Sequence, residues 1–176
     1  MLKQNHRVLL GIGSNLSSSY GDRFKNINIA MSYLEKYEMQ ILKSSSYYET
    51  PSYPEKKNPK FINVVIEITT YLKIEELASV LIFIEEMLQR KRQKKNDPRT
   101  CDIDIIDYDN QCLNFTYNKM KYIVPHEKYS IRNFVLFPLK EILPDWVDPK
   151  TNVHIDSLIK KLSIDDKKAI LKIKKS

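Results

Sequence analysis

Two aspartates inside an isoleucine-rich segment constrain this chain more than any other feature of its sequence. Residues 97–109 read DPRTCDIDIIDYD, and the run of β-branched residues predicts a strand. Because side chains alternate along a strand, Asp102 and Asp104 project from one face while Ile103 and Ile105 pack on the other. A buried carboxylate without a partner costs several kcal/mol, so the two neighbouring carboxylates need a group that compensates their charge.

A divalent cation is the group that suits two adjacent carboxylates. Mg²⁺ prefers hard oxygen ligands, uses one or two carboxylates, keeps several waters and binds substrate phosphates at its remaining positions. Arg99 lies close to the pair in sequence, where its guanidinium could hold a phosphate oxygen. The alternative at this point is an edge strand with two solvent-facing aspartates, and a lone Asp-x-Asp pattern by itself favours that alternative.

Length and composition limit the class of protein. We expect a single domain over residues 1–176, with a core at 7–150 and a Lys-rich tail at 151–176. The net charge of +7 does not predict a nucleic-acid partner, because the tail alone, with seven Lys and three Asp, supplies a surplus of four. We expect Cys101 and Cys112 to be small core or strand residues in a reducing cytoplasm. No apolar run resembles a signal peptide or a membrane span, so a cytoplasmic protein without a membrane partner is expected.

Hydrophobic periodicity predicts strands and helices in the order β-α-β-β-α-β. Strands are expected at residues 7–12, 40–49, 61–70 and in the aspartate segment, and helices at 23–37 and 74–92. Further along we expect a hairpin partner at 111–115, an extended segment at 122–126, a helix within 130–144 that Pro138 interrupts, and a short helix at 155–162. The expected class is α/β (α+β): a ferredoxin-like βαββαβ core with an added C-terminal hairpin and helices, in three α-β-α layers.

The glycines do not form a phosphate-binding loop of a known type. All three of them, Gly11, Gly13 and Gly21, lie within the first 21 residues, so a Walker A loop and a complete dinucleotide fingerprint are absent. We interpret Gly11 and Gly13 as part of a tight turn. A nucleotide would then be held by metal-bound carboxylates and basic side chains. The candidates are Arg90, Arg92, Arg99, Asp102, Asp104, His126 and Arg132.

Two further segments leave alternatives open. The basic run RKRQKK at residues 90–95 is either a solvated helix end or a loop that binds a polyphosphate. The Pro-rich segment at 50–60 and the strand after it contain aromatic residues near an asparagine, which are either core residues or a pocket for a flat heterocycle. These residues are Thr50, Pro51, Tyr53, Phe61 and Asn63.

Seven short motifs occur along the chain in one order. They are IGSNL at 12–16, Tyr48-x-Thr50-Pro51, Phe61-Ile62-Asn63, Glu85 with Arg90-x-Arg92, PRTCDIDII at 98–106, VPH at 124–126, and Arg132-x-Phe134-x-Leu136-x-Pro138-Leu139. With these motifs, residues 7–150 resemble the 6-hydroxymethyl-7,8-dihydropterin pyrophosphokinase family of the folate pathway. The chain departs from that family before Pro98, where many relatives carry Trp-Gly and this chain has Asn96-Asp97 in a segment one residue shorter.

The resemblance implies a reaction, its cofactors and a set of site residues. A member of this family transfers diphosphate from ATP to the hydroxymethyl group of the dihydropterin and releases AMP. Asp102 and Asp104 would hold two Mg²⁺ ions, and Arg90 and Arg92 on a mobile loop would act in catalysis with Arg99 and Asp102. ATP would contact Arg99, Ile105, Lys121, His126 and Arg132, and the pterin would contact Thr50, Pro51, Tyr53, Phe61, Asn63 and Phe134. We expect a monomer whose partners are these small molecules.

Two other functions stay open at this point. An Asp-x-Asp nucleotidyltransferase or glycosyltransferase would release pyrophosphate or a nucleoside diphosphate instead of AMP. An RNA-binding module on a ferredoxin-like sheet would expose aromatic residues on its central strands, whereas this chain would expose carboxylates there. Analysis of the nucleotide products distinguishes the three functions.

Overall fold

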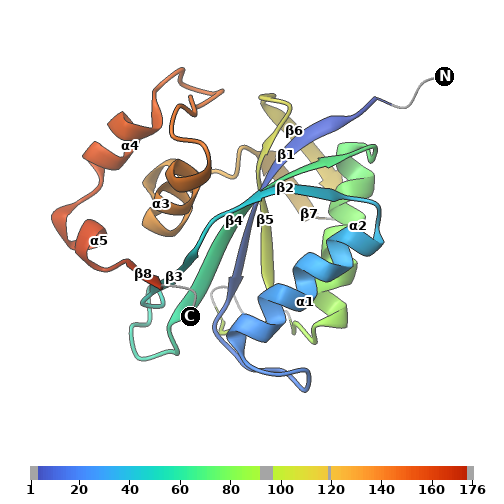
Figure 1. Cartoon of the computed structure of the whole chain (residues 1–176), viewed down its shortest axis with the longest axis horizontal. Helices are drawn as coiled ribbons and strands as arrows, with labels where there is room; N and C mark the ends of the chain where they lie inside the picture. The colour runs from blue at the N-terminus through green and yellow to red at the C-terminus, as the bar shows by residue number, and fades with distance from the viewer. Residues whose placement is uncertain (1–3, 92–96, 119, 174–176) are drawn as a thin grey trace.

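An antiparallel sheet lies at the centre of the molecule, with helices on both of its faces (Figure 1). The computed structural model describes residues 4–91, 97–118 and 120–173. Within these residues the sheet has six strands. Across the sheet they are β5 (Asp102–Tyr108), β1 (His6–Ser14), β4 (Phe61–Thr70), β3 (Tyr47–Thr50) and β8 (Leu171–Ile173), with β2 (Gln40–Ser44) also paired to β4. The predicted ferredoxin-like βαββαβ core is confirmed. Strand β1 lies between β5 and β4, and both β2 and β3 pair with the other edge of β4.

The strand predicted at residues 40–49 is in fact two strands. At the break, Ser45 N donates to Val65 O at 2.9 Å, and Val65 N donates to the Ser45 hydroxyl oxygen at 3.0 Å. A side-chain oxygen thus replaces one backbone acceptor of the ladder, and the chain can bend without leaving the Val65 donor unsatisfied. The bend lets β2 and β3 follow opposite ends of the ten-residue strand β4.

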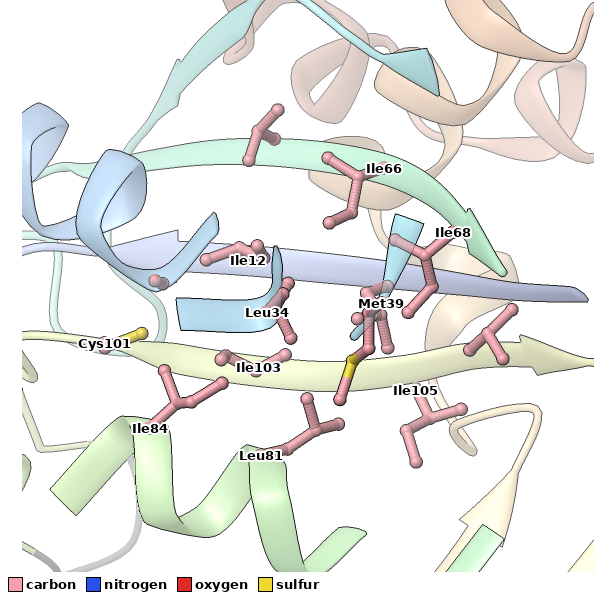
Figure 2. Packing of buried hydrophobic residues seen from close by; sticks show 14 of the residues in the cluster. Ile12, Leu34, Met39, Ile66, Ile68, Leu81, Ile84, Cys101, Ile103 and Ile105 are labelled. Atoms are coloured by element: carbon pink, nitrogen blue, oxygen red, sulfur yellow. The ribbon is translucent and has the colours of Figure 1, made fainter. Parts of the chain in front are cut away.

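Helices α1 (Arg23–Lys36) and α2 (Ile74–Met87) cover one face of the sheet. Asp22 caps α1 by accepting from Lys25 N at 2.8 Å, which satisfies one of the free donors at the helix start. Figure 2 shows the resulting core, in which Leu34 and Leu81 of the helices pack against Ile12, Ile66 and other strand residues.

The second helix is shorter than predicted. The expected end at residue 92 is wrong, because α2 ends at Met87 and Gln89 adopts a left-handed backbone with φ of 66°. The four side chains expected to face inward, Leu77, Leu81, Ile84 and Leu88, are all buried. The apolar periodicity therefore identified the buried face, while the local backbone at Gln89 fixed the end.

Helices α3 (Asn133–Ile142) and α4 (Ile155–Lys161) cover the other face and complete the three predicted layers (Figure 1). A one-turn helix, η1 (Tyr129–Ile131), precedes α3. The predicted interruption at Pro138 is wrong, because α3 continues through it. Leu136 and Leu139 on either side are fully buried, and their packing compensates for the backbone hydrogen bond that proline cannot donate.

The added hairpin does not pair as predicted. Strands β6 (Leu113–Tyr117) and β7 (Met120–Val124) pair with each other in a separate two-stranded sheet, so the expected pairing of residues 111–115 with β5 is wrong. The chain turns away from β5 at Asp109, whose carboxylate accepts from Arg7 N at 2.8 Å and so fixes the turn against β1. Strand β5 therefore remains at the edge of the large sheet. Cys101 is buried as expected, whereas Cys112 is exposed before β6.

The tail is more ordered than one short helix. After α4 it forms α5 (Ile164–Lys168) and β8, and β8 pairs with β3 in an antiparallel ladder. Lys172 of β8 also binds the Glu141 carboxylate at 3.0 Å, and Glu141 accepts from the Tyr48 hydroxyl of β3 at 2.9 Å. The tail thus adds an edge strand to the main sheet, which its lysine-rich composition did not indicate.

Candidate active site

One face of the sheet is apolar at one end and polar at the other. At one end Leu9 of β1, Val65 of β4 and Ile106 of β5 pack into the cluster beneath α3. At the other end, the residues on the same face are glycine, asparagine and aspartate, since alternate residues share a face. The register places these polar residues side by side on the three central strands.

Gly13 lies at the centre of this polar end. It pairs with Asn63 on one side and with Asp102 on the other. A side-chain carbon at this position would meet Asn63 Oδ1 at 3.1 Å and Phe61 Cδ1 at 3.6 Å, so the glycine leaves room for both neighbours. The interpretation of Gly11 and Gly13 as part of a tight turn is wrong, because both residues are inside strand β1.

Three arginines contact the two predicted metal ligands. Asp102 Oδ1 accepts from Arg90 Nη1 at 2.6 Å, and Asp102 Oδ2 accepts from Arg99 Nη2 at 2.8 Å. Asp104 Oδ2 accepts from Arg132 Nη1 at 3.2 Å. The side chains of Asp102 and Asp104 are 20% and 32% exposed, so both carboxylates are at a partly open surface. Segments distant in the sequence therefore converge on one edge of the sheet.

The two carboxylates differ in their ionisation. Burial opposes the charge of Asp102, but Arg99 and Arg90 outweigh it and hold the pKa of Asp102 below its ordinary value. Burial and the neighbouring charge of Asp102 raise the pKa of Asp104, and His126 and Arg132 offset this only in part. Asp102 is the more firmly ionised of the pair.

An apolar cleft of about 230 Å³ adjoins the carboxylates at the outer edge of β5. The predicted ATP residues Ile105, Lys121 and His126 line it, and so do both aspartates. The other lining residues come from α2, the segment after it, β5 and β7: Ala78, Leu81, Ile82, Glu85, Arg90, Ile103, Tyr122, Ile123 and Val124. Apolar walls beside a group of charges suit a ligand with a flat ring at one end and phosphates at the other.

The predicted pterin residues are only partly brought together. Asn63 donates its amide to Thr50 Oγ1 at 3.1 Å, and the Arg99 guanidinium lies 5.3 Å from the centre of the Phe61 ring. Pro51, directly after Thr50, is exposed, and Tyr53 is 84% exposed on the loop at residues 51–60. Phe134 is 5.3 Å from the Arg132 guanidinium, on the Asp104 side of the site.

Two site residues were quoted in the motifs without a role. Glu85 is buried in α2, accepts from Ile103 N of the edge strand at 2.8 Å and also binds Arg90. Asn15 is buried at the end of β1 and bonds to Arg99 N. A carboxylate in the apolar stripe of a helix was the sequence signal for Glu85. Arg92 lies outside the described residues.

Other sites in the described part of the chain do not compete with this one. A larger cleft, of about 550 Å³, is lined by Arg7, Lys43, Trp146 and their neighbours, and it contains none of the predicted residues. The described residues include no group of three or more His, Cys, Asp or Glu side chains that could bind a metal by themselves. None of the helices described is both long and apolar enough to span a membrane.

A sheet edge where carboxylates, arginines and a histidine meet an apolar cleft is typical of enzymes that bind a nucleotide and transfer its phosphoryl groups. Residues 9–144 match the model of one such family, 7,8-dihydro-6-hydroxymethylpterin-pyrophosphokinase (HPPK). The chain belongs to this family. The predicted enzyme class, an ATP-dependent diphosphotransferase of folate biosynthesis, is thereby confirmed.

Relatives in several organisms support the assignment. The chain is 32% identical over 161 residues to the 2-amino-4-hydroxy-6-hydroxymethyldihydropteridine pyrophosphokinase of Synechocystis sp., covering 91% of this chain and 78% of that protein. It is 34% identical over 142 residues to the Aquifex aeolicus protein of the same name, covering 81% and 83%. It is also 34% identical over 167 residues to the folic acid synthesis protein fol1 of Pneumocystis carinii, but spans only 22% of that longer protein.

The fold is also similar to solved structures. The TM-score is 0.77 against the crystal structure of Plasmodium falciparum HPPK-DHPS with pteroate, at 14% identity, covering 98% of this chain and 47% of that chain. Against the wild-type protein the TM-score is 0.71, at 15% identity, covering 90% and 45%. At this identity the similarity concerns the fold, and it confirms the predicted α+β class.

Proposed function

We propose that this chain transfers the diphosphate of ATP to the hydroxymethyl oxygen of 6-hydroxymethyl-7,8-dihydropterin at the polar end of the sheet. The oxygen would bond to the β-phosphorus while the bond from that phosphorus to the α-phosphate oxygen breaks, and AMP leaves. The main support for this proposal is the register at Gly13, which has Asn63, a predicted pterin residue, on one side and the carboxylate residue Asp102 on the other. Adjacent strands are about 4.8 Å apart, so the acceptor and the phosphates could meet above one glycine.

Asp102 and Asp104 are suited to Mg²⁺. Both carboxylates are on one face, both are partly exposed, and both offer hard oxygen ligands. Because the described residues hold no larger ligand group, the phosphates of ATP and waters would complete the coordination. Bound Mg²⁺ would neutralise charge on the phosphates and orient them for transfer. We propose that two ions bind at this site.

Arg99 would act between the two substrates. Its guanidinium lies against Phe61, and it reaches Asp102 at 2.8 Å. Its Nε is buried and has no hydrogen-bond partner among the described residues. A buried donor of this kind favours an anionic acceptor such as a phosphate oxygen. We assign Arg99 to the phosphates at the junction of the ATP cleft and the pterin site.

The other basic residues would bind the phosphates from different sides. Arg132 contacts Asp104, and His126 lines the cleft beside Lys121. Arg90 would exchange its contact with Asp102 for the phosphates when ATP and the cations enter, and Glu85 would keep its side chain near the site. Fixed cations that bind charge developing on the leaving AMP lower the barrier without a strong general base. We extend the same role to Arg92.

The pterin would lie against the end of β4. Asn63 and Thr50 offer hydrogen-bonding groups to a flat heterocycle, and Phe61 and Phe134 offer ring faces. Pro51 and Tyr53 would join them only if the loop at residues 51–60 closes over the ligand, since Tyr53 is now in solvent. We further propose that residues 1–176 act as one cytoplasmic, monomeric catalytic unit, with a core at 7–150 and the tail at 151–176. Size-exclusion chromatography with light scattering tests the monomer.

Product analysis tests the proposal. The chain is incubated with ATP, Mg²⁺ and 6-hydroxymethyl-7,8-dihydropterin, and the nucleotides are separated by ion-exchange chromatography. We expect AMP and the pterin diphosphate in equal amounts. ADP as the product, or pyrophosphate with a nucleotidylated acceptor, would contradict the proposal and favour another Asp-x-Asp transferase.

A further inference from the structure

We propose that Asn15 is a positioning residue that couples the loop over the pterin site to Arg99, so that the two substrates are held in register for transfer. The inference rests on the proposed function, because it takes the loop at residues 51–60 to cover the pterin and Arg99 to bind the phosphates. Asn15 is not assigned to either substrate. It would act through the two segments that its side chain joins.

The Asn15 side chain joins three parts of the chain that are far apart in sequence. The residue is 2% exposed. Its Nδ2 donates to Ser52 Oγ at 3.2 Å and to Pro59 O at 3.1 Å. Its Oδ1 accepts from Arg99 N at 2.6 Å. Both amide hydrogens and one acceptor position are therefore used, and no smaller side chain could make all three bonds.

On one side, the amide closes the base of the loop. Ser52 and Pro59 are near the two ends of the loop, and the Ser52 hydroxyl also donates to Pro59 O at 2.6 Å. The two Asn15 donors and this hydroxyl bond together hold the ends at a fixed separation. Tyr53, directly after Ser52, is exposed to solvent.

On the other side, residues 15 and 16 hold the backbone of Arg99. Besides the bond from Arg99 N to the Asn15 side chain, the Arg99 carbonyl accepts from Asn15 N at 3.0 Å and from Leu16 N at 3.1 Å. Both backbone polar groups of Arg99 are thereby satisfied by the end of β1. A shift of the loop base would move the Asn15 amide and, through it, the guanidinium beside Asp102.

A purely structural role is the competing explanation, and Asn26 offers a matched control. Asn26 is also a fully buried asparagine. Its Nδ2 donates to Leu16 O at 2.9 Å, and its Oδ1 accepts from Ser18 Oγ at 2.6 Å. It supports the same turn without touching either the loop or Arg99. Asn26→Ala should therefore lower stability while leaving the chemical step unchanged.

The test compares the rate of chemistry with binding and stability. Single-turnover formation of AMP is measured at saturating ATP, Mg²⁺ and pterin, beside the dissociation constants of a non-hydrolysable ATP analogue and of the pterin. We expect Asn15→Ala to slow the single turnover by about 10- to 100-fold, because small misplacements of reacting groups have effects of this size. Both dissociation constants should change by less than about threefold, since no contact with either ligand is removed.

Two further variants keep the test decisive if Asn15→Ala does not fold. Asn15→Asp retains the acceptor for Arg99 N and loses both donors to the loop, and Ser52→Ala removes one loop contact without altering the Arg99 side. Each should slow the single turnover, with Ser52→Ala the milder of the two. A wild-type rate in Asn15→Ala, or in both further variants if that protein is unfolded, would overturn the inference. If the wild-type enzyme releases no AMP, the proposed function itself is wrong.

Discussion

Replacing each of the two aspartates by asparagine should separate their roles in the folded protein. Asp102 bonds to two arginines, and the Arg90 side chain is only 12% exposed. Removing one partner of a fully buried ion pair costs about 3–5 kcal/mol. The side chains here are partly exposed, and Arg90 keeps Glu85. We therefore expect Asp102→Asn to lower the free energy of unfolding by about 2–3 kcal/mol.

Asp104→Asn should behave differently. Among the described residues, Asp104 pairs with Arg132 at 3.2 Å, and both side chains are more than a quarter exposed. Such a pair contributes about 0–1 kcal/mol, and the substitution also relieves repulsion between the two carboxylates. We expect the free energy of unfolding to stay within about 1 kcal/mol of the wild-type value. Both variants should lose turnover, since each removes a proposed Mg²⁺ ligand.

Urea denaturation in EDTA at pH 7 measures the difference. Trp146 is the single tryptophan and is buried, so its fluorescence reports unfolding. Asp165→Asn, at an exposed position in α5, is the control and should change stability by less than about 0.5 kcal/mol. Equal losses in Asp102→Asn and Asp104→Asn, or a larger loss in Asp104→Asn, would refute the electrostatic argument.

Three further predictions address the arginines and the tail. Arg99→Ala should weaken Mg²⁺-dependent binding of an ATP analogue by about 1.5–3 kcal/mol in calorimetry, and unchanged affinity would remove Arg99 from the phosphate site. Arg90→Ala should slow single turnover more than it weakens ATP binding, whereas wild-type chemistry would leave it a helix-end residue. Glu141→Gln should lower unfolding free energy by about 1–2 kcal/mol at pH 7. Although burial opposes its ionisation, bonds from Lys172, Ser46 and Tyr48 hold the pKa of Glu141 below its ordinary value. The ionised form therefore stabilises the fold above the unfolded pKa of about 4.3. The difference from Gln should shrink below that value and vanish once the pH of the urea titrations falls through the lower pKa of the folded state.

The site was predicted in part because its residue types are unusual for their positions. Carboxylates inside an isoleucine-rich strand predicted the face that Asp102 and Asp104 share, and the register confirms it. The motifs also indicated the family. The contacts of Arg90 and Asn15 were not predictable, because they depend on how the end of α2 and the end of β1 approach β5 in space.

The helices and strands can likewise be divided into features that the sequence predicted and features that it did not. The strand at Phe61–Thr70 and the buried stripe of α2 followed from periodicity alone, because burial on one face leaves a repeat in the sequence. The end of α2 at Met87 and the break at Ser45 did not, since each depends on a single backbone conformation or hydrogen bond. A single backbone conformation or hydrogen bond leaves no periodic pattern in the sequence.

The sequence by itself determined the βαββαβ core, the face of each main strand and the chemistry of the aspartate segment. These features depend on local patterns of apolar and polar residues, which any long-range arrangement must respect. Only the tertiary structure decided that β6 pairs with β7 and that β8 pairs with β3. It also decided that Gly13 separates Asn63 from Asp102. Partners in a sheet are chosen by the packing of segments distant in the chain, and no single segment contains that information.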